Sequence, residues 1–324
     1  MSSNNTSEFS STQESQQSSS SSQRITLFSG EIQNTKFLSP VLKSINIDKF
    51  IQIIVTECGI KFICENYQTI QATTFIDRNL FVKYHMENEK TPQTIRILTT
   101  ELLHVLSFLL TKQSNRYQQQ QQQQSKSSLI IKYDNDKRLK LKIISNDRLF
   151  KSSIQTLDTI NINVWTMAFV NRITLDASVL KDFWKFANTN ADSISIEMNN
   201  DEPWFLMSTK SQFREFSQQI DASSTHIEHY ECTVPSINHY QMKSIKYTVR
   251  PLMLADKINI RFSSAGLLNM QFFIPIDSVI DDSHFDDGDG LQQQQQQQRQ
   301  IIHSTTTASD SQRCFVEFFI IPII

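Results

Sequence analysis

The sequence predicts an α+β protein of two similar domains, each built from antiparallel sheets and two short helices. The first observation is a repeated order, since each half reads as one strand, one helix, about five strands, a second helix and about three strands. The second is size, because 324 residues suit about two domains of roughly 100–200 residues each. The third is composition, because 39% apolar residues are enough for two hydrophobic cores.

Three segments have compositions that are typical of disorder. Residues 1–23 are rich in Ser, Gln and Asn, residues 113–128 contain a Gln run, and residues 277–312 combine an acidic stretch with a second Gln run. Such segments bury too little apolar surface to offset the entropy lost on ordering. We therefore expect a tail (1–23), a first domain (24–156) with an exposed loop at 113–128, a connector (157–165), and a second domain (166–324) with an insertion at 277–312.

The first half contains two expected helices. The apolar residues of Thr35–Ser44 share one helical face, although Pro40 argues against a regular helix. The second helix, Thr100–Thr111, is rich in Leu and follows a plausible cap at Thr99. The expected strands are Ile25–Gly30, Phe50–Thr56, Ile60–Asn66, Ile70–Phe75, Leu80–Met86, Thr94–Leu98, Leu129–Tyr133, Leu139–Ser145 and Arg148–Thr156.

The second half repeats this order. A strand at Thr166–Leu175 leads to Asp176, the expected N-cap of a helix that continues through Asn188, and a short helix is expected near Arg250–Asp256. The remaining strands are expected at Ser193–Met198, Trp204–Ser208, Phe213–Ile220, Ile227–Thr233, Tyr240–Tyr247, Lys257–Phe262, Leu267–Ile274 and Arg313–Ile321.

The helix after Asp176 is amphipathic. Its apolar residues, Phe186 among them, are expected to pack on a sheet, while Lys181 and Lys185 fall one turn apart on the polar stripe. Antiparallel sheets need one face covered, and two short helices in each half could cover it. We therefore expect the helices of both halves to lie side by side and to share one polar outer surface.

Four sequence motifs resemble a known family. They are CGIKFICEN at Cys58–Asn66 with IQATTFI at Ile70–Ile76, DEPWFLMST at Asp201–Thr209, and RCFVEFF at Arg313–Phe319. The Rad-one subunit family of the checkpoint clamp has similar runs, GIKVTVEN with VQANAFI, DKPYFRLST and CFVEYY, in the same order. This clamp is the heterotrimeric nine-one-one ring, which is related to proliferating cell nuclear antigen. The departures are the N-terminal tail, the Gln loop, the insertion and the short C-terminal end.

The resemblance implies a DNA clamp fold, with sheets outside and helices lining a central hole. It implies two other clamp subunits as partners, double-stranded DNA bound without sequence specificity, a clamp loader, and checkpoint and repair proteins, all in the nucleus. Flexible lysines suit weak and exchangeable phosphate contacts. The residues expected to face DNA are Lys36, Lys43, Lys112, Lys181, Lys185 and Arg250.

Ring closure would need exposed strand edges. By the topology of the family, these edges are expected at Arg148–Thr156 in the first domain and Phe213–Ile220 in the second. The residues expected at subunit interfaces are Arg148, Phe150, Ile154, Phe213, Phe216 and Ile220. A homotrimeric replication clamp is the alternative assembly.

The sequence offers no strong catalytic, metal or cofactor site. His226, His229, Cys232 and His239 have a spacing that is unusual for structural zinc. The acidic loop at 281–289 fails as a calcium loop, since Phe285 and Gln296 would occupy ligand positions. The enzymatic alternative, a DNA 3′–5′ exonuclease, would need clustered carboxylates, which are scattered here. No apolar run reaches the ~20 residues of a membrane span, and the four scattered cysteines are read as reduced thiols. We therefore expect a chain with no catalytic residues, cofactor or metal.

Overall fold

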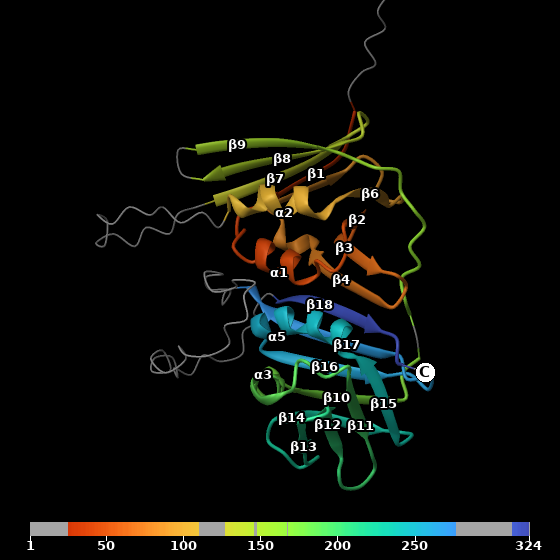
Figure 1. Ribbon diagram of the computed structural model, residues 1–324. Coiled ribbons are helices and arrows are strands. Elements are labelled where there is room, and N and C mark those ends of the chain that lie inside the picture. The colour runs from red at the N-terminus through yellow and green to blue at the C-terminus, as the bar shows by residue number, and fades with distance from the viewer. Residues whose placement is uncertain (1–24, 110–126, 146–147, 167, 277–312, 324) are drawn as a thin grey trace, which may run out of the picture.

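The computed structural model describes residues 25–109, 127–145, 148–166, 168–276 and 313–323 (Figure 1). Its first half has the predicted order of one strand, one helix, five strands, one helix and three strands, with a single 3-10 turn, Arg78–Leu80, before the fifth strand. The elements are β1 Thr26–Ile32, α1 Leu38–Ser44, β2 Phe50–Thr56, β3 Gly59–Asn66, β4 Ile70–Asp77, β5 Lys83–Met86, β6 Gln93–Leu98, α2 Thr99–Ser107, β7 Ser127–Asp134, β8 Arg138–Ser145 and β9 Arg148–Gln155.

The second half has the same order, so the predicted repeat is confirmed. A 3-10 turn, Lys246–Thr248, joins α4 to α5, and the three pieces form one continuous helical segment. The elements are β10 Asn171–Asp176, α3 Ala177–Phe186, β11 Ser193–Met198, β12 Phe205–Lys210, β13 Glu215–Ile220, β14 Ile227–Cys232, β15 Ser236–Gln241, α4 Met242–Ile245, α5 Val249–Leu254, β16 Lys257–Phe262, β17 Leu268–Pro275 and β18 Arg313–Ile320.

The strands form three antiparallel sheets, and the largest crosses between the halves. The five-stranded sheet has the order β5-β1-β7-β8-β9, and the four-stranded sheet has the order β13-β12-β11-β15. The nine-stranded sheet, β14-β10-β16-β17-β18-β4-β3-β2-β6, joins the last strand of the second half to β4 of the first. The predicted α+β clamp architecture is confirmed at this level.

The repeat makes every strand in one half equivalent to a strand in the other. Strands β14, β10, β16, β17 and β18 correspond in order to β5, β1, β7, β8 and β9, and β4 corresponds to β13. Inside the chain β18 pairs with β4, whereas their counterparts β9 and β13 are sheet edges at opposite ends of the molecule (Figure 1). The two halves therefore differ at these strands, because β9 and β13 each lie at the edge of a sheet, whereas their equivalents β18 and β4 have a partner strand on both sides.

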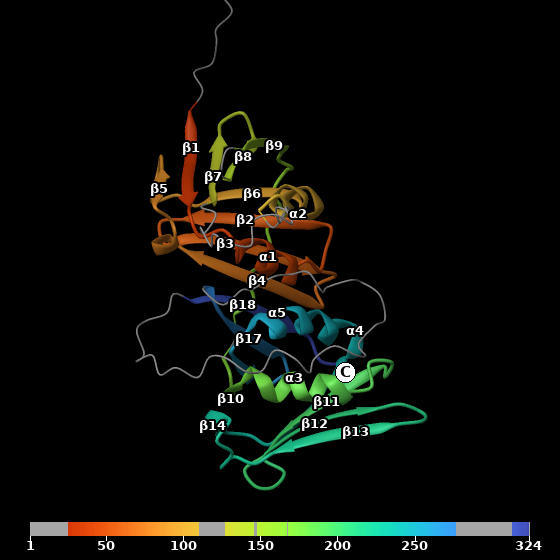
Figure 2. The same cartoon turned by 90° about the vertical axis from the view of Figure 1, so that its left-hand side faces the viewer.

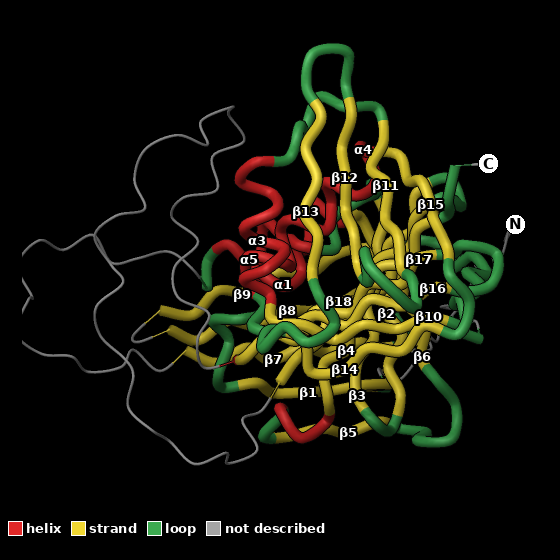
Figure 3. Tube along the Cα trace, turned by 90° about the horizontal axis from the view of Figure 1, so that it is seen from below, coloured by secondary structure: helices red, strands yellow, loops and turns green. Residues whose placement is uncertain are grey.

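The helices lie in one row on one side of the sheets. Helix α1 contacts α2 and α5, and α5 contacts α3, so the order of the row is α2, α1, α5, α3 (Figure 2). Seen from below, the helices gather on one flank and the strands occupy the remainder (Figure 3). The prediction that the helices of both halves share one surface is therefore confirmed.

Pro40 fits helix α1 because of where the helix begins. The helix starts at Leu38, so Pro40 is its third residue. Amides in the first turn of a helix have no intrahelical partner, and a proline there removes no hydrogen bond. The predicted start at Thr35 was too early, since residues 35–37 lie before the helix.

One predicted strand was wrong. The segment Tyr240–Tyr247 was expected to be extended, but β15 ends at Gln241 and α4 follows at once. Met242, Ile245 and Leu252 are buried at a helical spacing. The alternation of apolar and polar residues near Tyr240 indicates strand β15 alone. Extending the predicted strand beyond Gln241 missed the change from strand periodicity to helical periodicity.

Other elements begin later or end earlier than predicted. Strand β10 begins at Asn171, not at Thr166, and β13 begins at Glu215, so Phe213 precedes it. Asp176 is the N-cap residue of α3, but its side chain makes no capping hydrogen bond and instead lies 3.2 Å from His226 Nδ1. The tail and most of the two Gln-containing segments fall outside the described residues.

The connector between the halves is held against the nine-stranded sheet by one buried side chain. The amide nitrogen of Gln71, on β4, donates to the carbonyl of Asn163 at 2.9 Å, and its amide oxygen accepts from the backbone N–H of Trp165 at 3.2 Å. The Trp165 ring also lies 6.4 Å from that of Phe319 on β18. Strands from both halves therefore position this part of the chain.

Candidate DNA-facing surface and subunit edges

The helix row carries most of the cations predicted to face DNA. Lys36, just before α1, is exposed, while Lys43 in α1 and Arg250 in α5 are half-buried. Lys112 lies outside the described residues. The helices of the row thus carry four of the six predicted cations, Lys43, Lys181, Lys185 and Arg250, and Lys36 lies in the turn before α1.

Lys181 is engaged by the protein itself. Its ammonium donates to the carbonyl of Ala255, the residue that caps the C-terminus of α5, at 2.9 Å. Burial lowers the pKa of this ammonium, and the nearby charge of Asp256 opposes that shift. A lysine at a helix C-terminus satisfies an unpaired carbonyl and the negative end of the dipole. The expectation that Lys181 lies fully on a solvated stripe is therefore wrong.

Lys185 lies on the exposed stripe as predicted, but it has an acidic neighbour. Its ammonium is 2.7 Å from Asp182 one turn earlier, and both side chains are largely exposed. Such i,i+3 pairs on a surface contribute little to stability. Lys185 can therefore exchange Asp182 for another anion at small cost.

Two exposed lysines on the same surface were missed from the sequence. Lys243 lies in α4 and Lys246 in the 3-10 turn that follows. Neither ammonium has a hydrogen bond or ion pair among the residues that the structure describes. The signal was present as the spacing Lys243, Lys246, Arg250, but a predicted strand at Tyr240–Tyr247 concealed it.

Strands β9 and β13 each have one unpaired side among the residues that the structure describes. Within this part of the chain, strand β9 pairs only with β8, and β13 pairs only with β12. Both predicted edge positions are therefore confirmed as sheet edges. An unpaired edge presents a row of backbone N–H and C=O groups that another strand can take up.

An aromatic pair lies beside each edge. Phe150 on β9 stacks on Phe108 at the end of α2, with ring centroids 5.0 Å apart. Phe216 on β13 lies 6.1 Å from Phe186 at the end of α3. Phe186 is 56% exposed and Phe108 is 40% exposed, so each edge has apolar surface that the chain itself does not cover.

The structure revises the roles of several predicted interface residues. Ile154 and Ile220 point into the chain's own core, at 7% and 8% exposure, so only their backbones lie at an edge. Phe213 is 91% exposed in the turn before β13, and Arg148 is exposed at the start of β9. Phe186 was expected to be buried against the sheet, but it is largely exposed and lies beside Phe216 at the edge strand β13. Leu149, at 51% exposure on β9, was missed.

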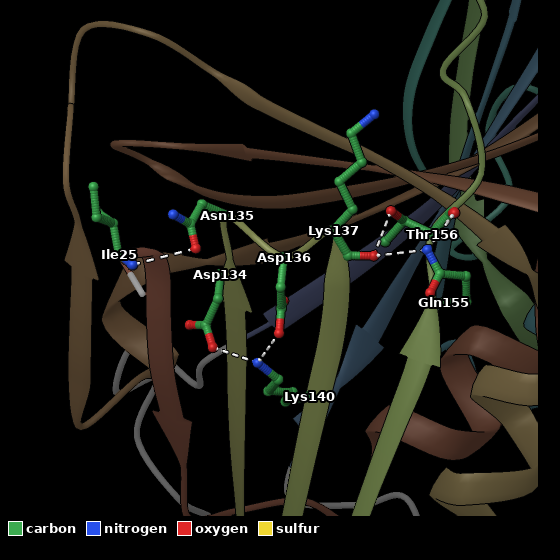
Figure 4. A network of polar contacts seen from close by, with 8 residues as sticks. All are labelled: Ile25, Asp134, Asn135, Asp136, Lys137, Lys140, Gln155 and Thr156. Atoms are coloured by element: carbon green, nitrogen blue, oxygen red, sulfur yellow. Dashed lines mark hydrogen bonds and ion pairs between the residues drawn. The ribbon is translucent and has the colours of Figure 1, made fainter. Parts of the chain in front are cut away.

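The five-stranded sheet that carries β9 is braced at the turn between β7 and β8 (Figure 4). The ammonium of Lys140 lies 2.5 Å from Asp134 and 2.7 Å from Asp136. The carbonyl of Lys137, in the same turn, accepts from the Thr156 hydroxyl at 2.8 Å. These contacts link the end of β9 to the turn and fix the edge strand in place.

We expect Lys140→Met to lower the free energy of unfolding by about 1–3 kcal/mol, because the buried carboxylate of Asp134 then loses its cation. Urea unfolding of the isolated chain measures this effect. Lys132→Met removes an exposed lysine from the facing position on β7 and should stay within about 0.5 kcal/mol of wild type. Adding Asp134→Asn to Lys140→Met should recover part of the loss, and no recovery would contradict the charge argument.

No candidate metal centre emerges among the described residues. Within them, no group of three or more His, Cys, Asp or Glu side chains could hold a metal ion. Cys64 and Cys314 are buried thiols, and burial raises their pKa to about 12 and about 11. His229 pairs with Glu231 at 3.5 Å. None of the described helices is long and apolar enough to cross a membrane.

Comparison with known proteins identifies the family. A sequence profile described as "Repair protein Rad1/Rec1/Rad17" matches residues 27–274. Similar proteins include the human cell cycle checkpoint protein RAD1, 24% identical over 75% of this chain and 84% of the relative. The DNA damage checkpoint control protein rad1 of Schizosaccharomyces pombe is 19% identical over 76% of this chain and 81% of the relative.

Solved structures show the same fold. The PCNA2–PCNA3 complex of Sulfolobus tokodaii matches with a TM-score of 0.64 at 12% identity, over 91% of this chain and 98% of that one. The proliferating cellular nuclear antigen of Entamoeba histolytica matches with a TM-score of 0.62 at 15% identity, over 93% and 100%. Fold and sequence profile agree, and the chain belongs to the Rad1 family of repair proteins.

Proposed function

We propose that this chain is one subunit of a heterotrimeric checkpoint clamp that encircles double-stranded DNA. One observation carries the proposal: β18 pairs with β4 inside the chain, while their equivalents β9 and β13, at opposite ends, each have one side with no partner strand in the described part of the chain. A neighbour that pairs with β9 through its own counterpart of β13 repeats the β18–β4 pairing and continues the same arc. Repeating that junction between subunits closes a ring, and the helix row then lines its inner wall.

A ring retains DNA by topology, so its inner wall needs no tight or sequence-specific grip. Weak phosphate contacts suit such a wall, because a contact that breaks during sliding is replaced by an equivalent one. Lysine and arginine side chains on the helix row supply these contacts. The predicted DNA-facing residues remain Lys36, Lys43, Lys112, Lys185 and Arg250. Lys181 is less available for phosphate contact, because its ammonium donates to the carbonyl of Ala255.

The names of the relatives support a role in DNA damage checkpoint control. The proposed role is that of a non-enzymatic scaffold in the nucleus, loaded onto DNA by a clamp loader and bound by checkpoint and repair proteins. The two edges differ in charge, since β9 presents Arg148 and Lys151, whereas β13 begins with Glu215.

Mass measurement tests the assembly. The purified chain should be a monomer at micromolar concentration, because both edges would lack their proper neighbours. Co-expressed with two other clamp-like chains of the same cell, it should purify as a 1:1:1 complex by native mass spectrometry. A stable homotrimer of the chain alone would contradict the proposal and favour the homotrimeric replication clamp.

A further inference from the structure

We propose that the outer face of the five-stranded sheet, on the side opposite α2, is a docking surface for an acidic peptide segment of a partner protein. The surface consists of the outward-facing lysines of β7, β8 and β9, and we call it the outer basic face: Lys132, Lys140, Lys142 and Lys151. The inference goes beyond the proposed clamp, because it concerns the side of the sheet away from the helix row and specifies the chemistry of a binding partner.

The four lysines lie on one face of the sheet because side chains alternate along a strand. The register places Lys132 opposite Lys140 and Lys142 opposite Lys151. The intervening side chains of β8 are at most 2% exposed and belong to the core, and they are Leu139, Leu141 and Ile143. Helix α2 contacts β9 and lies on that core side (Figure 1). The lysines therefore point away from the core and from the helix row.

The outer basic face belongs to a positively charged part of the chain. Across the described residues of β7, β8 and β9 and the turn between β7 and β8, seven Lys and Arg residues against two Asp residues leave a net charge of +5, whereas the whole chain has a net charge of -2. Both aspartates, Asp134 and Asp136, pair with Lys140 (Figure 4). Within the part of the chain that the structure describes, the ammonium groups of the other three lysines have no hydrogen bond or ion pair. Their charge is therefore available to an anionic ligand.

Lys142 and Lys151 are direct cross-strand neighbours, which disfavours the sheet itself. Side chains directly opposite each other on an antiparallel pair lie about 4.5–5.5 Å apart at Cβ, and like charges at such positions are destabilising. A local conflict in an otherwise consistent sheet indicates a constraint other than folding. A carboxylate that binds between Lys142 and Lys151 replaces this repulsion with two attractive contacts.

The equivalent face in the second half of the chain neutralises its cations. Strands β16, β17 and β18 occupy the positions of β7, β8 and β9. There Arg261 lies 3.1 Å from Glu317, and Lys257 pairs with Glu228. The strand arrangement therefore does not require uncompensated lysines on this face, and their presence in the first half needs another reason.

Apolar side chains between the lysines favour a peptide over a nucleic acid. Ile130, which lies opposite Lys142, and Ile144 are half-buried on the same face. A peptide that carries both carboxylates and apolar side chains can cover both kinds of group. The outward-facing positions described on these three strands include no aromatic residue on which a base could stack, and the flat face of a sheet does not enter a groove of duplex DNA.

Fluorescence anisotropy tests the inference with the purified full chain and a labelled synthetic peptide that alternates glutamate and leucine. An extended peptide rises about 3.3 Å per residue, so about ten residues cross the three strands with margin. The wild-type chain should bind this peptide, with an affinity that falls as the salt concentration rises. Lys132→Gln with Lys142→Gln should weaken binding about five- to tenfold, because two uncompensated charges are lost from the face.

The matched control is Lys90→Gln with Lys243→Gln, which removes the same charge from two exposed lysines elsewhere in the chain. This control should bind the peptide within about twofold of wild type. A peptide with glutamine in place of glutamate should not bind. Urea unfolding should show that Lys132→Gln with Lys142→Gln is at least as stable as wild type, because the repulsion between positions 142 and 151 is relieved.

Three results would overturn the inference. They are no binding of the glutamate peptide by the wild-type chain, equal binding by Lys132→Gln with Lys142→Gln, and an equal loss of affinity in the control pair. A short DNA duplex whose affinity falls in Lys132→Gln with Lys142→Gln, while the glutamate peptide does not bind, would assign the face to nucleic acid instead. None of these measurements involves a ring, whereas the mass measurement of the assembly does, so the inference and the clamp function can fail separately.

Discussion

Leu149→Asp and Phe186→Lys should each strongly weaken binding to a different neighbour in the ring. Leu149 lies on β9 and Phe186 beside β13, and both side chains are about half exposed in the isolated chain. Pairwise co-purification with each clamp-like partner is the measurement. We expect each variant to lose one partner by about 30-fold or more, corresponding to about 2 kcal/mol, and to keep the other.

The physical reason is that a charge would be buried without a partner. Edge pairing covers the apolar side chains next to the strands, and an unpaired charge there must be desolvated. Folding should not suffer, because both positions are exposed in the isolated chain. Lysine at position 186 also places a cation in the last turn of α3, which the helix dipole favours.

The matched control is Val234, which is 52% exposed in the turn between β14 and β15. Val234→Asp and Val234→Lys introduce the same charges away from both edges and should leave both partners bound. The edge assignment is contradicted if Leu149→Asp and Phe186→Lys lose the same partner, or if neither loses any. Loss of both partners by a single variant would mean that it no longer folds, and circular dichroism of the isolated chain detects this.

The order of elements was predictable because each depends on local pattern. The run Phe50–Thr56 and the run Lys257–Phe262 begin and end as predicted. The first is apolar and β-branched apart from Gln52, the second alternates polar and apolar residues, and polar residues flank both. The same local logic failed at Met242, where a strand passes into a helix without a Gly or Pro between them. A change from strand periodicity to helical periodicity that no Gly or Pro marks is difficult to locate to within a few residues.

The candidate site was only partly predictable, because it depends on contacts between distant segments. The sequence identifies Lys181 as a cation on a polar stripe, but its partner Ala255 is 74 residues away. Likewise, Phe186 has apolar character that predicts burial, while the tertiary arrangement leaves it beside Phe216 at an open edge. Sequence therefore indicates which helices carry charge, and the fold decides which charges are free.

Phe318→Ala should cause the largest loss of stability among the changes proposed here, about 3–5 kcal/mol. Phe318 lies on β18 opposite Ala72 of β4, so it occupies the one junction at which the two halves share a sheet. Its side chain is 0% exposed and lies 6.2 Å from the Phe272 ring in an edge-to-face arrangement. Removing the ring leaves a cavity that rigid strands on both sides cannot close.

Urea unfolding of the isolated chain measures this loss, with Phe213→Ala as the matched control. The same atoms are removed there, but from a side chain that is 91% exposed, so the free energy of unfolding should change by less than about 0.5 kcal/mol. A loss below about 1 kcal/mol for Phe318→Ala would mean that the β18–β4 junction contributes little. The argument for ring closure would then weaken as well, because the junction between subunits is proposed to be an equivalent of this one.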